Sequence, residues 1–142
     1  MNDNIIEQLL GKPYFVIDFL PCQVPEGSPG RFFDIENYML SSQYGKELRQ
    51  KFLNIVLKLN CYYSMTLYDW SEKRETVSPD PQTISEQITA NDHLTYVITG
   101  SCETLISIGP DETHITVYTS DDSIRQLSAQ LAMSEGLFVW EP

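Results

Sequence analysis

Three short stretches in the second half of the chain constrain the fold most. Residues 94–99, 103–108 and 113–119 each alternate apolar and polar side chains, which is the period of a half-buried β-strand. The segment from Gly109 to Glu112, between the last two stretches, has the composition of a hairpin turn. The sequence therefore predicts a meander of three consecutive strands, and with it a largely antiparallel sheet.

Further strands are predicted outside this meander. Residues 13–20 are rich in β-branched and aromatic side chains and nearly free of charge, as in a strand covered on both faces. Residues 61–70 alternate in polarity, and the apolar residues 137–140 are suited to add to the sheet. We expect about five to six strands in total.

Helical spacing of apolar residues marks the segments between these strands. The strongest case is residues 44–59, with Leu48, Phe52, Ile55 and Leu59 on one face. Shorter helices are predicted before Gly11, over residues 31–40, from a capping box at residues 83–86, and from Ser120 as N-cap to Gly136. The chain of 142 residues has the usual size of one domain. We predict a single α+β domain over residues 1–142, with helices packed against a mixed, mainly antiparallel sheet.

Two irregular segments interrupt this pattern. Residues 21–31 contain three prolines and two glycines, and residues 71–82 are first charged and then broken by proline. We expect both to be surface loops, and the second to be the most mobile part of the chain.

The charge of the chain is strongly negative and unevenly placed. Nine Lys and Arg residues against 20 Asp and Glu residues give a net charge of −11, and residues 75–142 contain eleven acids with Arg125 as the only base. A field of this sign repels phosphate groups, which argues against nucleic acid and anionic membranes as partners. One interpretation is that the excess of acidic residues serves only to keep the protein soluble. The other is an acidic face that binds a basic protein, for which the candidates are Asp111, Glu112, Asp121 and Asp122.

The cysteines and the N-terminal sequence bear on the compartment. Cys22, Cys61 and Cys102 are about forty residues apart and include no C-x-x-C pair, so we expect buried, reduced thiols rather than disulfides or a zinc site. Residues 1–11 lack the basic and apolar regions of a secretory signal, and no apolar run has the length of a membrane span. The cytoplasm is the expected location.

Motifs for catalysis, metals and cofactors are missing. The two histidines, His93 and His114, each lie beside acids, but no spacing places them together on one face, so their role stays open and no metal is predicted. The stretch Glu26 to Gly30 resembles a nucleophile elbow only superficially, because Pro29 supplies no amide after the serine. Glycine-rich phosphate-binding motifs are absent, so no nucleotide cofactor and no catalytic residue is predicted.

Two surfaces remain as binding candidates. If residues 61–70 form one strand, Tyr62, Tyr68 and Trp70 share a face, and such rings suit interfaces, although core and edge packing is the more common use of such rings. Asp18 interrupts a covered strand, and with Arg31 of the following loop it is a candidate for lining a pocket.

The sequence leaves two hypotheses of function. The first is a non-enzymatic protein-interaction module, of the immunity or antitoxin kind, that masks a basic partner. The alternative is a small-molecule-binding protein or an unusual enzyme, with a pocket between the aromatic face, the loop of residues 21–31 and Asp18.

Overall fold

The computed structural model describes residues 3–27 and 29–142, in which the chain forms five helices and seven strands. The helices are α1 (Asp3–Leu10), α2 (Pro29–Ser41), α3 (Gln43–Asn60), α4 (Pro81–Thr89) and α5 (Asp122–Ser134). The strands are β1 (Tyr14–Asp18), β2 (Met65–Asp69), β3 (Arg74–Val77), β4 (Thr95–Thr99), β5 (Thr104–Ile108), β6 (His114–Thr119) and β7 (Phe138–Trp140). The predicted α+β class is confirmed.

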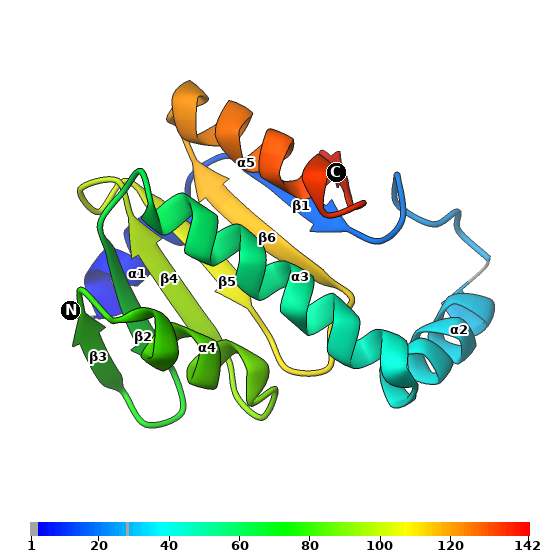
Figure 1. Cartoon of the computed structure of the whole chain (residues 1–142). Helices are drawn as coiled ribbons and strands as arrows, with labels where there is room; N and C mark the ends of the chain where they lie inside the picture. The colour runs from blue at the N-terminus through cyan, green and yellow to red at the C-terminus, as the bar shows by residue number, and fades with distance from the viewer. Residues whose placement is uncertain (1–2, 28) are drawn as a thin grey trace.

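The strands form one sheet in the order β3-β2-β4-β5-β6-β1-β7 (Figure 1). Every pair of neighbouring strands is antiparallel, so the expectation of a mixed sheet is wrong. The predicted meander is present as β4, β5 and β6, and the last apolar residues add β7 beside β1. The sheet is also larger than predicted, because residues 74–77 form the edge strand β3.

The two faces of the sheet are covered differently. Helices α3, α4 and α5 lie across one face, and α1 lies behind the other (Figure 1). The core under α3 includes the four residues predicted from its helical spacing, together with Phe15 and Ile17 of β1. On the face of α1, Ile6 and Leu9 pack against a cluster that contains Tyr68 and Tyr96. Alternation along the strands therefore divides the apolar residues between two cores.

Several local predictions need correction. The segment of residues 71–82 is not simply a mobile connection, since it contains β3, whose short, charged sequence is typical of an edge strand. Helix α4 begins two residues before the predicted capping box, because Asp80 is the N-cap and accepts a hydrogen bond from the Thr83 amide at 2.8 Å. Helix α5 is capped by Asp121 rather than Ser120.

The cysteines are free, as expected, but they are exposed rather than buried. Cys22 lies in the loop after β1, Cys61 follows the end of α3, and Cys102 lies in the turn between β4 and β5. Small apolar residues usually go to the interior. In this chain each cysteine falls in a connection, where no packing surface covers it.

Candidate functional site

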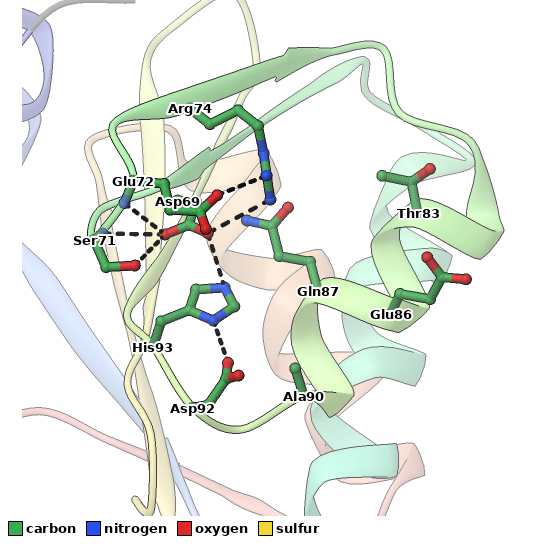
Figure 2. A pocket seen from close by; sticks show the side chains of 10 residues that line it. All are labelled: Asp69, Ser71, Glu72, Arg74, Thr83, Glu86, Gln87, Ala90, Asp92 and His93. Carbon is green, nitrogen blue, oxygen red and sulfur yellow. Dashed lines mark hydrogen bonds and ion pairs between the residues drawn. The ribbon is translucent and has the colours of Figure 1, made fainter.

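A polar cavity of about 390 Å³ lies between α4 and the end of the sheet where β2 turns into β3 (Figure 2). Helix α4 supplies one wall, the β2–β3 turn supplies the other, and the loop that leads into β4 supplies the floor. The lining residues are Asp69, Ser71, Glu72, Arg74, Thr83, Glu86, Gln87, Ala90, Asp92 and His93.

Asp69 accepts more hydrogen bonds than the other carboxylates that line the cavity. It is the last residue of β2 and alternates with Leu67 toward α4, so its side chain is only 3 % exposed. Its Oδ1 accepts hydrogen bonds from the Ser71 amide at 3.0 Å, the Ser71 hydroxyl at 2.9 Å and the Glu72 amide at 3.3 Å. Burial raises the pKa of Asp69, but these hydrogen bonds and the nearby His93 outweigh burial and hold the pKa below its ordinary value. Asp69 is therefore a fixed negative charge.

His93 lies between two carboxylates. Its Nε2 is 3.5 Å from Asp69 Oδ2, is buried, and makes no hydrogen bond of good geometry within the described residues. Its Nδ1 contacts Asp92 Oδ1 at the exposed edge of the cavity. The imidazole ring therefore has a carboxylate next to each of its two nitrogens. This arrangement does not form a nucleophilic triad, because the Ser71 hydroxyl donates to Asp69 and not to His93.

Arg74 and Gln87 complete the cavity. Arg74 reaches across from β3, with Nη1 2.7 Å from Glu72 Oε2 and Nη2 3.6 Å from Asp69 Oδ2. Gln87 extends from α4, and its Nε2 is 3.5 Å from the Thr95 hydroxyl. The arginine is thus already paired with the wall of the cavity, whereas the glutamine is weakly bonded.

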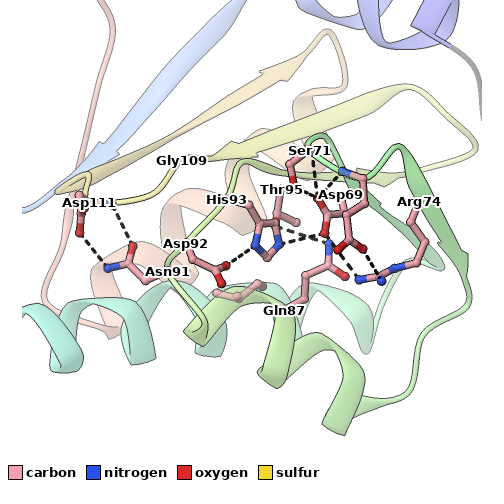
Figure 3. A network of polar contacts seen from close by, with 12 residues as sticks. Asp69, Ser71, Arg74, Gln87, Asn91, Asp92, His93, Thr95, Gly109 and Asp111 are labelled. Atoms are coloured by element: carbon pink, nitrogen blue, oxygen red, sulfur yellow. Dashed lines mark hydrogen bonds and ion pairs between the residues drawn. The ribbon is translucent and has the colours of Figure 1, made fainter.

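A second network fixes the floor of the cavity to the turn between β5 and β6 (Figure 3). Asn91 Nδ2 donates to Asp111 Oδ1 at 3.1 Å, and the Asp111 amide donates to Asn91 Oδ1 at 2.8 Å. Beneath it, the buried Arg49 guanidinium donates to the Ile88 carbonyl and to the Gly109 carbonyl. The loop that carries His93 is therefore held to the β5–β6 turn by Asp111, and the end of α4 that precedes the loop is held by Arg49.

The cavity belongs to a larger acidic end of the sheet. The strand register places Asp18, His114, Thr95, Asp69 and Arg74 at the same end of the sheet. The turns and loops beyond them carry further acids, and Glu36 of α2 accepts a hydrogen bond from Thr113 at 3.1 Å. We define the acidic end as Asp18, Glu36, Asp69, Glu72, Asp92, Asp111 and Glu112.

The four acids predicted to form one contact surface are separated. Asp111 and Glu112 precede β6 and lie at the acidic end, whereas Asp121 and Asp122 follow β6 at the opposite end. Asp121 also accepts hydrogen bonds from the amides of Ser123 and Ile124 as the N-cap of α5.

The predicted aromatic face is not a single surface. Tyr62 lies in the turn after α3 and is 69 % exposed, because the strand begins only at Met65. Tyr68 is buried, and its hydroxyl donates to Asp3 at 3.3 Å. Trp70 is half-buried between the rings of Tyr68 and Tyr96. The structure therefore uses Tyr68 and Trp70 in the core beneath α1.

The residues predicted to line a pocket do line two adjoining cavities. Asp18 lines one of about 160 Å³, and Arg31 lines one of about 210 Å³. Both cavities share Leu20, Val24 and Phe32. Asp18 accepts hydrogen bonds from Trp140 Nε1 at 3.1 Å and from the Leu20 amide at 3.3 Å. These cavities lie at β1, whereas Trp70 follows β2, so the aromatic residues do not contribute to them.

Sequence reasoning identified His93 beside Asp92 but missed Asp69, Arg74 and Gln87. The signal for Asp69 was its place at the end of an alternating strand, on the apolar face. Its contact with His93 depends on the pairing of Asp69 with Thr95 across β2 and β4, which the sequence does not reveal.

The described residues contain no cluster of three or more His, Cys, Asp or Glu side chains suited to a metal ion. No helix in the described part of the chain is long and apolar enough to cross a membrane. Comparisons of the chain with protein-family models, curated proteins and solved structures found no match. Function is therefore argued from the geometry of the site.

Proposed function

We propose that the chain is a non-enzymatic protein-interaction module of the cytoplasm, which binds a basic partner through the acidic end of its sheet. Masking of a basic protein by an immunity or antitoxin protein is a function of this kind. The observation that carries the proposal is the gathering, at one end of the sheet, of carboxylates from β1, β2, α2 and three connections.

The nearby cations leave this charge largely uncompensated. Arg49 is buried on backbone carbonyls, and Arg74 pairs with two carboxylates of the cavity wall. Lys73 lies over the Trp70 ring, 3.0 Å from its centroid. A surface of one sign steers an oppositely charged partner and raises its association rate, and salt screens this effect.

The test begins with capture of partners from a native cytoplasmic extract at low and high salt. Association kinetics of the captured protein are then measured against two triple variants. The first neutralises the acidic end outside the cavity: Glu36→Gln, Asp111→Asn and Glu112→Gln. The second is the matched control, with the same change in net charge elsewhere: Glu7→Gln, Glu103→Gln and Asp122→Asn.

We expect the first variant to slow association several-fold, and the control to change it less than twofold, because steering depends on local charge. Equal rates for the two variants would contradict the proposal. So would the failure to find any protein that is retained at low salt and released at high salt.

The loop cavities favour small-molecule binding as a second candidate. Their walls are mainly apolar, and one of the two is also lined by Asp18 and Trp140, which provide polar groups. A ligand there should quench or shift Trp140 fluorescence on titration, and Phe32→Ala should abolish the change. A response that persists in Phe32→Ala would exclude this site.

A further inference from the structure

The buried carboxylate of Asp18 has only neutral hydrogen-bond donors. Asp18 is the last residue of β1 and is 7 % exposed. Its Oδ1 accepts a hydrogen bond from the Leu20 amide at 3.3 Å, and its Oδ2 accepts one from Trp140 Nε1 at 3.1 Å. Within residues 3–27 and 29–142, no lysine, arginine or histidine forms an ion pair with Asp18. Buried charges in proteins are normally paired, so this carboxylate is a place where a cation is missing.

The base that faces Asp18 across the sheet does not supply that cation. His114 of β6 is the cross-strand neighbour of Asp18, but its Nε2 lies 3.5 Å from Glu112 Oε2. Burial raises the pKa of Asp18 and outweighs the opposite effects of its hydrogen bonds and of His114. The fold therefore disfavours the ionised form of Asp18, which a positive charge beside it would favour.

Asp18 also lines a cavity with apolar walls. This cavity of about 160 Å³ shares Leu20, Val24 and Phe32 with the adjoining one of about 210 Å³. Together they lie near the lower end of the range of small-molecule sites, roughly 300–1,000 Å³. Arg31 lines the second cavity, but it is exposed, so water and salt screen its charge. The two cavities thus combine apolar walls with a buried carboxylate.

We propose that these cavities bind a small apolar ligand that carries a protonated amine, an inference that rests on the second candidate function, small-molecule binding at the loop. The ammonium group lies against Asp18, whose carboxylate can accept about four hydrogen bonds, more than the protein supplies. The apolar body of the ligand packs on Val24 and Phe32. The net charge of −11 attracts such a cation and repels an anion of the same shape.

The test uses the isolated full chain at neutral pH and three probes with the same alkyl chain: hexylamine, hexanol and hexanoate. They differ in the charge of the head group, which is positive, zero and negative. Binding is followed by NMR at the indole N–H of Trp140, which donates directly to Asp18. Trp70, the other tryptophan, lies between Tyr68 and Tyr96 and serves as the internal reference. We expect a saturable shift of Trp140 with hexylamine, at least several-fold weaker binding of hexanol, and no saturation with hexanoate.

Variants assign the charge preference to Asp18. Asp18→Asn keeps the shape and an acceptor for Trp140, so it should lower the affinity for hexylamine to that for hexanol and leave hexanol binding unchanged. Phe32→Ala should remove the response to both. The matched control Glu26→Gln removes an exposed carboxylate from the same loop and should change hexylamine binding less than twofold. An unchanged Trp70 signal shows that each variant is folded.

Three results would overturn the inference: hexylamine does not saturate, hexanol or hexanoate binds as tightly as hexylamine, or Asp18→Asn binds hexylamine as the wild type does. The outcomes also separate it from the candidate function on which it rests. If hexylamine and hexanol bind equally and Phe32→Ala removes both, the small-molecule site stands and only the preference for an amine is overturned. If none of the three probes binds, the site and the inference are overturned together.

Discussion

Replacement of Arg49 by Met tests the contact that joins the cavity to the rest of the fold. Arg49 lies on α3 and is 5 % exposed. Its Nε and Nη2 donate to the Ile88 carbonyl at 3.1 and 2.6 Å, and its Nη1 donates to the Gly109 carbonyl at 2.8 Å. One side chain therefore links the end of α4 to the turn between β5 and β6.

The expected loss of stability follows from these hydrogen bonds. Methionine fills much of the space of the arginine stem, but it leaves two buried carbonyls without donors, at about 1–3 kcal/mol each. Removal of a buried cation, whose pKa is lowered by burial, offsets part of this loss. We expect Arg49→Met to lower the free energy of unfolding by about 2–4 kcal/mol. Urea denaturation at neutral pH measures it.

Two controls make the result interpretable. Lys46→Met removes an exposed cation from the same helix and should change stability by less than about 0.5 kcal/mol. Arg49→Lys keeps the charge, but one ammonium cannot reproduce the fork that joins two carbonyls, so its loss should be intermediate. If Arg49→Met were within about 0.5 kcal/mol of the wild type, the carbonyls would not depend on the guanidinium and the reasoning would be refuted.

Three further predictions concern titration and exposure. Burial raises the pKa of Asp18 above 3.8, so wild-type stability falls as the pH rises from that value to the raised pKa. The free energy of unfolding of Asp18→Asn, measured in urea, should therefore increase relative to that of the wild type between about pH 4 and pH 7. A stability difference that does not change with pH would contradict this. The pKa of Asp69 is lowered, so Asp69→Asn should be about 1–2 kcal/mol less stable at neutral pH, with the difference disappearing as the pH falls through the lowered pKa. If Asp69→Asn remained less stable than the wild type in acid, the loss of stability would not come from the lowered pKa of Asp69. Iodoacetamide should label Cys22, Cys61 and Cys102 of the native protein within a few-fold of their rates in the unfolded chain, as mass spectrometry can follow. If any one of these cysteines were labelled tenfold more slowly in the native protein than in the unfolded chain, that cysteine would not be exposed.

The parts of the fold that the sequence predicts are those with a strong local period. The meander of residues 94–119 and the face of α3 with Leu48 and Phe52 were predictable, because alternation and helical spacing are local properties. Strand β3 was not, since Arg74–Val77 is short and polar and gains its structure only by pairing with β2. Tyr62 was misplaced because the chain makes a turn after α3, in which the Tyr62 and Tyr63 amides donate to the Leu59 carbonyl, so β2 begins only at Met65.

Helix α5 shows a different limit of sequence reasoning. Its apolar spacing marks Ile124, Leu127 and Leu131 as the buried stripe, but the fully buried residues are Ile124, Ser128 and Ala132. Leu127 and Leu131 are only partly buried at the sides of this stripe. Small residues lie where the helix packs closely on its neighbours, and hydrophobicity alone does not indicate such positions.

The candidate site depends on contacts between residues distant in sequence. Asp69 and His93 meet because β2 pairs with β4, and Arg49 links the end of α4 to the β5–β6 turn through the Ile88 and Gly109 carbonyls. Local pattern gives the strand that ends at Asp69 and the acid beside His93. Local pattern does not give the strand order, and the contact between Asp69 and His93 depends on that order.

The placement of charge follows from the alternation of turns in an antiparallel sheet. Consecutive connections lie at opposite ends, so Asp111 and Asp121 are close in sequence but lie on either side of the six residues of β6, about 20 Å apart at the usual rise of a strand. Asp69 and Asp111 are far apart in sequence, yet the β2–β3 turn and the β5–β6 turn lie at the same end. The acidic half of the chain is therefore not one acidic face. The sheet divides its carboxylates between two ends, and it adds to one of them Asp18, Glu36, Asp69 and Glu72 from the nearly neutral first half.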